Sequence, residues 1–115
     1  MAVARRYPEV RIVYIAVDVA RLVSRVQLLK SAGYAVIATT SRHVAVLAAG
    51  DHGIDGVIVC DSLSPGEDES LAYGLAIVAP RTAVLRVREL TDDGLAVEAY
   101  LVSKVNELFR GRSGR

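Results

Sequence analysis

The sequence of 115 residues contains no tryptophan, a single phenylalanine and a single cysteine. Because Cys60 has no second cysteine to pair with, an internal disulfide is excluded, and a reducing, cytoplasmic location is expected. The scarcity of aromatic residues means that a core must be built mainly from Val, Leu, Ile and Ala. Hydrophobic residues make up 52% of the chain, a share that supports a well-filled core and excludes a low-complexity disordered protein.

An excess of charge of one sign is also lacking, since 14 basic residues stand against 13 acidic ones. Such a balance provides no basic surface for nucleic acid or for an anionic membrane. No apolar run approaches the roughly 18 to 20 residues that span a bilayer. We therefore expect neither nucleic acid nor a membrane as a partner. The length predicts a single domain over residues 1–110, followed by a flexible basic tail over residues 111–115.

Apolar runs rich in β-branched residues predict five strands. They are expected at Val10–Val17, Ala35–Thr39, Gly56–Cys60, Thr82–Arg88 and, as a short last strand, Leu95–Glu98. The first and third runs are apolar almost throughout, which is typical of strands that are buried on both faces of a parallel sheet.

Segments with apolar residues at helical spacing separate these strands. Asp18 and Ser41 are expected to cap the first two helices, and Ser64-Pro65-Gly66-Glu67 has the form of a capping box that starts the third. The predicted inward-facing stripes are Val19, Leu22, Val23, Val26 and Leu29 in the first helix, Val44, Leu47 and Ala48 in the second, Leu71, Leu75 and Val78 in the third, and Leu101, Val105 and Leu108 in a closing helix.

The alternation of strands and helices predicts an α/β fold made of right-handed βαβ units. We expect a three-layer sandwich around a doubly wound parallel sheet of five strands, in the flavodoxin-like order 2-1-3-4-5. Only residues 89–94 separate the fourth and fifth strands, so the helix between them is expected to be missing or very short. In this strand order a functional site lies outside the carboxyl ends of strands one and three.

Two stretches of the sequence carry a resemblance to a known family. Residues 11–34 combine an apolar strand, an amphipathic helix and Ala32-Gly33-Tyr34, and residues 55–66 combine a strand, Asp61 and a Pro-Gly pair four and five residues later. Both stretches resemble the receiver domain of two-component response regulators. The resemblance implies a cytoplasmic signal-transduction protein without enzyme activity, with Asp61 as the phosphorylated residue and a protein partner such as a histidine kinase.

The sequence departs from that family at other positions of the phosphorylation site. Receivers carry an acidic pair that binds Mg²⁺ at the end of the first strand, where this chain has Ala16 and Val17. Receivers also carry a Ser or Thr at the end of the fourth strand, where this chain has Val87 or Arg88. A lysine is expected at the end of the fifth strand, and that strand contains none.

These departures leave two hypotheses open. In the first, the chain is an atypical receiver that acts mainly through protein–protein interaction. In the second, it is a true single-domain response regulator that is phosphorylated on Asp61, with Asp18 and Asp61 as the ligands of a weakly bound Mg²⁺. The plain alternative for these residues is that Asp18 only caps the first helix and that Asp61 only begins a loop.

An interaction surface is predicted on the third helix and the fourth strand. Tyr73 and Ile77 fall off the inward stripe of that helix, and Arg86 and Arg88 lie on one face of the strand by its two-residue period. Two arginines on one face imply that no packed helix covers it. We therefore expect a homodimer, or a complex with another protein, that contacts these four residues.

The remaining reactive residue types are expected to be structural. His43 and His52 lack neighbours at metal-ligand spacing and are interpreted as surface residues. Cys60 ends an apolar strand and is interpreted as an inert thiol of the core.

Overall fold

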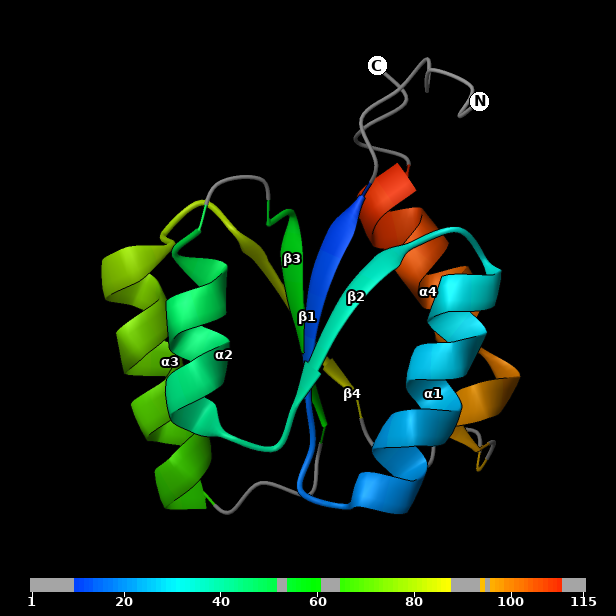
Figure 1. The fold of residues 1–115 in the computed structure, drawn as a ribbon, viewed down its shortest axis with the longest axis horizontal. Coiled ribbons are helices and arrows are strands. Elements are labelled where there is room, and N and C mark those ends of the chain that lie inside the picture. Colours follow the sequence, from blue (N-terminus) through cyan, green and yellow to red (C-terminus); the bar gives the residue numbers. More distant parts are fainter. Residues whose placement is uncertain (1–9, 52–53, 61–64, 88–93, 95, 111–115) are drawn as a thin grey trace, which may run out of the picture.

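The computed structural model describes residues 10–51, 54–60, 65–87, 94 and 96–110. Strands and helices alternate along the chain, as Figure 1 shows. The elements are β1 (Arg11–Ile15), α1 (Val19–Ser31), β2 (Ala35–Thr39), α2 (Arg42–Ala49), β3 (Gly56–Cys60), α3 (Pro65–Val78), β4 (Ala83–Val87), a 3-10 turn η1 (Val97–Ala99), α4 (Leu101–Val105) and a π-helical turn η2 (Asn106–Arg110).

The four strands form one parallel sheet in the order β2-β1-β3-β4. The register places Ile12 beside Val36 on one side and Gly56 on the other. The α/β class and the order of the first four strands are therefore as predicted. Because all four strands run in the same direction, their carboxyl ends meet at one edge of the sheet.

Helices cover both faces of the sheet and make a three-layer arrangement (Figure 1). On one face α1 and α4 pack over alternate strand residues that include Ile12, Tyr14 and Ile58. On the other face α2 and α3 pack over the intervening residues, which include Val13, Val57 and Val59. The long apolar runs of β1 and β3 follow from this position, since both faces of each strand are buried.

The predicted fifth strand is wrong at Val97 and Glu98, which belong to the 3-10 turn η1. The physical reason is a helical stripe that continues to the end of the described chain. Val97, Leu101, Val105 and Phe109 recur every four residues, and all of them are buried in the core under α1. The crossover helix is expected to be missing or very short at residues 89–94, and all of these except Gly94 lie outside the described residues.

The predicted inward stripe of α2 is wrong at two of its three residues. Val44 and Leu47 are 43% and 62% exposed, whereas Ala48 is partly buried against the core and the buried residues of this helix are Ala45 and Ala49. The small alanine face lets α2 lie close to the sheet. Its neighbour Val46 contacts α3 at Gly74, where an added Cβ would lie 3.0 Å from the Val46 side chain.

The stripes of α1 and α3 are confirmed in part. Leu22, Val26 and Leu29 are buried as predicted, but Val19 and Val23 are exposed, and Arg25 takes their place in the buried face. In α3 Leu71 and Leu75 are buried, whereas Val78 is 44% exposed at the last turn.

The predicted helix starts agree with the structure where it describes them. Asp18 is the N-cap of α1, and its Oδ1 accepts a hydrogen bond from the backbone N–H of Arg21 at 3.2 Å. Ser41 caps α2 in the same way through Val44, and Pro65 is the first residue of α3. Ser64 lies outside the described residues. None of the described helices combines the length and the apolar character that crossing a membrane requires.

Candidate functional site

The predicted site lies at the carboxyl edge of the sheet, where β1 and β3 end side by side. Ile15 pairs with Val59, so Ala16 and Cys60 follow at the same level of the sheet. Asp61 comes directly after Cys60 and lies outside the described residues. Its phosphorylation and its role as a metal ligand stay predictions.

Asp18 is the carboxylate that follows β1 at this edge, and it is engaged in its own helix. One carboxylate oxygen caps α1, and the other lies 3.8 Å from Nε of Arg21. Ala16, at a position where receivers have an acidic residue, is fully buried and has an apolar side chain. A Mg²⁺ ion at this edge would therefore have to draw Asp18 away from the cap.

A wider search for metal ligands gives the same result within the described part of the chain. No three His, Cys, Asp or Glu side chains there gather closely enough to hold a metal ion. His43 is exposed on α2, in agreement with a surface role, and His52 lies outside the described residues.

Sequence reasoning missed a buried charge beside the end of β3. Arg25 of α1 is 1% exposed, and its Nε donates to a carboxylate oxygen of Glu98 at 3.1 Å. Its Nη1 also donates to the Sγ of Cys60 at 3.5 Å. The guanidinium therefore links α1, β3 and η1. It places a cation next to the carboxyl end of β3, and the carboxylate of Glu98 balances that charge.

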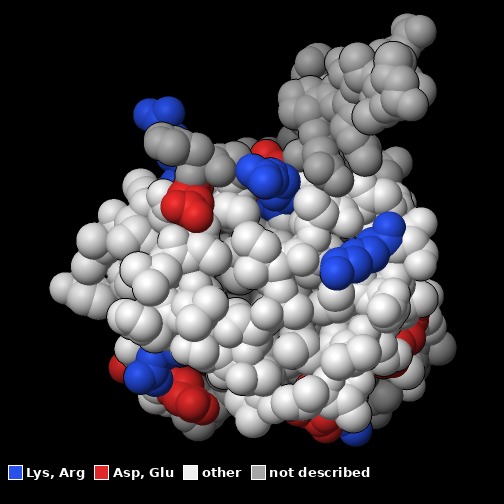
Figure 2. Space-filling view, in the orientation of Figure 1, with Lys and Arg blue, Asp and Glu red and all other residues white. Residues whose placement is uncertain are grey.

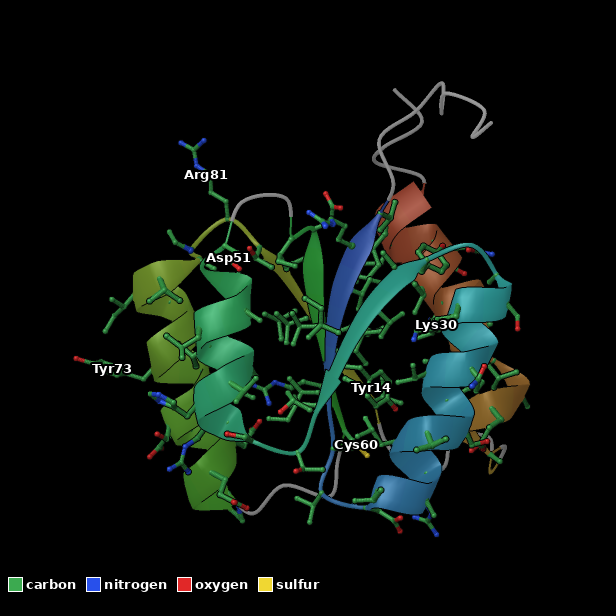
Figure 3. The ribbon with its side chains drawn as sticks, viewed as in Figure 1. Tyr14, Lys30, Asp51, Cys60, Tyr73 and Arg81 are labelled. Atoms are coloured by element: carbon green, nitrogen blue, oxygen red, sulfur yellow. The ribbon has the colours of Figure 1, made fainter. Side chains whose placement is uncertain are left out.

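The position of Arg25 along α1 was the feature of the sequence that could have predicted its burial. It stands three residues after Leu22 and four before Leu29, inside the buried stripe, while the acidic partner is 73 residues away along the chain. Cys60 is buried on this same side of the sheet, together with Tyr14 (Figure 3). Its place in the core agrees with the prediction.

The predicted interaction residues of α3 and β4 lie on the opposite face. Tyr73 and Ile77 are 72% and 63% exposed, and Figure 3 shows Tyr73 extending away from the helix. Arg86 is exposed on β4 and forms an ion pair with Asp68 in the first turn of α3. Arg88 lies outside the described residues.

A groove separates α3 from β4 on this face, with a volume of about 380 Å³. Val59 lines it from the sheet, Leu75 and Ala76 line it from α3, and Val84 and Arg86 line it from β4. Val84 is 41% exposed, which agrees with the prediction that no packed helix covers this side of β4. The groove is thus an apolar hollow with an ion pair between its two sides.

Comparisons with known proteins add no family to this description. No protein-family model matches the chain, and no curated protein matches it. The resemblance to receiver domains therefore rests on the residues quoted above.

Proposed function

We propose that this chain is a receiver-like signalling module with a flavodoxin-like fold that acts through protein–protein contact, without phosphorylation. The observation that carries the proposal is the state of the carboxyl edge. Phosphoryl transfer to a carboxylate depends on a metal ion and on cations that neutralise the phosphoryl oxygens. Here the carboxylate after β1 caps a helix, and the cation beside β3 is paired with Glu98.

The face formed by α3 and β4 is the proposed contact for a protein partner. Its groove is lined mainly by apolar side chains, and Tyr73 and Ile77 project from the helix beside it. Exposed aromatic and aliphatic residues around a hollow are typical anchors of a protein interface. A hollow of this shape suits a protruding apolar segment of another protein, with the Arg86–Asp68 pair at its polar border.

A second candidate function is a phosphorylated single-domain response regulator that uses Mg²⁺. It is favoured by the parallel order of β1 and β3, which brings the residue before Asp61 and the Asp18 cap to the same edge of the sheet. In this reading Asp18 and Asp61 both bind the metal, and Asp61 accepts the phosphoryl group.

Titration with Mg²⁺, followed through the backbone amide signals in NMR spectra, separates the two functions. We expect no saturating shift of the Asp18 and Cys60 amides below millimolar Mg²⁺, because the edge offers at most two carboxylates. A parallel titration with Ca²⁺ is the control, because weak binding to surface carboxylates does not distinguish the two ions. Sub-millimolar, Mg²⁺-selective binding that Asp61→Asn abolishes would favour the phosphorylated regulator instead.

A further inference from the structure

Within the described part of the chain, no strand pairs with the outer edge of β2. It is the outermost strand in the order β2-β1-β3-β4. The N–H of Ala35 donates to Val10, and the carbonyl of Thr39 accepts from Ala16, so these residues turn their backbone groups toward β1. Directions alternate along a parallel strand, and the N–H and C=O groups of Val36 and Ala38 therefore point outward.

Nothing in the sequence of β2 protects this edge. The strand reads Ala-Val-Ile-Ala-Thr, without a charged residue or a proline, and its register with β1 runs without a bulge. Soluble proteins commonly guard an edge strand with lysine, proline or a bulge, because an open edge pairs with another strand. An unguarded edge of this kind favours pairing.

The apolar surface at the outer edge of β2 extends to exposed residues of α2. Ile37 is 43% exposed on the face of the sheet that α2 covers. Val46 contacts α3, so Val44 lies on the opposite flank of α2, toward β2. Val44, which is 43% exposed, therefore adds an apolar side chain next to the outer edge of β2.

The other face of the sheet repeats the pattern through α1. Arg25 reaches Cys60 and Glu98 on one flank of this helix, which leaves the exposed Val19 and Val23 on the opposite flank, toward β2. Figure 2 shows the surface over β2, between α1 and α2, with only scattered charged side chains. The open edge is thus the centre of a charge-poor, apolar surface.

We infer that two copies of this chain pair antiparallel through β2, so that one sheet continues across both. A two-fold axis at Ile37 sets Val36 opposite Ala38 of the second copy, and the outward backbone groups of both residues then bond. The two Ile37 side chains meet at the axis, where Cα atoms lie about 4.5 Å apart. Val44 of each copy extends the contact.

The uncharged strand favours a second copy of the chain as the occupant. Since β2 carries no charge, apposing it to itself meets no like-charge repulsion, and two-fold pairing is the commonest closed assembly of soluble proteins. The α3–β4 groove remains the proposed contact for a different protein.

Sedimentation velocity across the micromolar range tests this assignment with a matched pair of variants. Ile37→Lys places two cations at the axis, and we expect the dimer to weaken about tenfold or more. Ile77→Lys makes the same change at an exposed isoleucine on the other side of the molecule and is expected to leave the dimer intact. Circular dichroism and thermal melting verify that both variants fold.

Amide hydrogen exchange gives a second, residue-specific readout on the unmodified chain. The amides of Val36 and Ala38 should exchange more slowly as the concentration rises, while those of Ile37 and Thr39 stay protected at every concentration. A chain that remains monomeric, a dimer that survives Ile37→Lys, or a dimer that only Ile77→Lys dissociates would overturn the inference. None of these results depends on Mg²⁺ binding at the carboxyl ends of β1 and β3, so the Mg²⁺ titration still tests the proposed function independently of the dimer.

Discussion

At the scale of single residues, a few side chains fix how the layers meet. Arg25 is the largest fully buried side chain, and its charge is balanced by Glu98 across 73 residues of sequence. Gly56, at the start of β3, lies so close to the ring of Phe109 that a Cβ atom there would be 2.0 Å from it. Both contacts join the C-terminal segment to the first half of the chain.

Removing the Glu98 carboxylate should destabilise the protein, because the charge of Arg25 is buried. In Glu98→Ala the Arg25 guanidinium loses its carboxylate while it stays almost fully buried, so we expect a loss of about 2–4 kcal/mol in the free energy of unfolding. The value lies at the lower end for buried pairs because the Glu98 side chain is itself 40% exposed. Urea denaturation measures the loss.

Arg21→Ala on the same helix is the control. Its pair with Asp18 is exposed and should contribute about 0–1 kcal/mol. An equal, small effect of both substitutions would mean that water solvates Arg25 and that its burial carries little energetic weight.

Adding one methyl group at Gly56 should disturb the core. Gly56→Ala forces the ring of Phe109 away from β3, and overpacking of this kind costs about 1–3 kcal/mol. Gly66→Ala in the first turn of α3 meets no atom within 4 Å, and alanine there should be neutral or stabilising by up to about 1 kcal/mol. Thermal unfolding compares the two, and equal melting temperatures would contradict the close contact.

At the scale of elements, the N-caps of the helices were predictable from the sequence, whereas the buried face of α2 was not. Asp18 and Ser41 were predicted as N-caps because both stand directly before a run of helical spacing, and both accept the expected backbone hydrogen bond. The buried face of α2 could not be predicted in the same way. Val44 and Leu47 are larger and more apolar than Ala45 and Ala49, so the hydrophobic pattern favoured the face that is in fact exposed. The close approach of Val46 to Gly74 of α3, which the sequence does not show, accompanies the buried alanine face.

The capping role of Asp18 predicts a specific pair of effects. Asp18→Ala should destabilise the protein by about 1 kcal/mol, because the N–H of Arg21 loses its acceptor. Asp18→Asn keeps an oxygen at the cap and should restore most of that stability, although it removes the charge. Guanidinium denaturation of the three proteins measures this, and an alanine variant as stable as the asparagine variant would contradict the role.

At the scale of the whole molecule, four strands follow from the apolar runs and their separation by helices, and the flavodoxin-like order expected for them agrees with the order 2-1-3-4. The expected fifth strand is not shown: Ala96 forms a β-bridge, and Val97 and Glu98 already belong to η1, where the buried stripe from Val97 to Phe109 begins. The candidate site was predictable only in part. Asp18 caps α1, as the sequence predicts. The buried ion pair of Arg25 could not be predicted, because Arg25 interrupts an apolar stripe and its partner Glu98 lies in η1, far away along the chain.

At the carboxyl end of the sheet, the described Asp18 caps α1 and the buried Arg25 is paired with Glu98. We propose on this basis a signalling module that binds a protein partner at the α3–β4 groove and a second copy at β2. In this proposal the module works without a phosphoryl group on Asp61.

Intact-mass spectrometry after incubation with Mg²⁺ and acetyl phosphate shows whether Asp61 accepts a phosphoryl group. An established receiver domain in the same reaction verifies the donor, and Asp61→Asn identifies the modified residue. We predict that the unmodified chain keeps its mass while the established receiver gains a phosphoryl group. A stoichiometric phosphoryl adduct on this chain that disappears in Asp61→Asn would contradict phosphorylation-independent function and favour the phosphorylated response regulator.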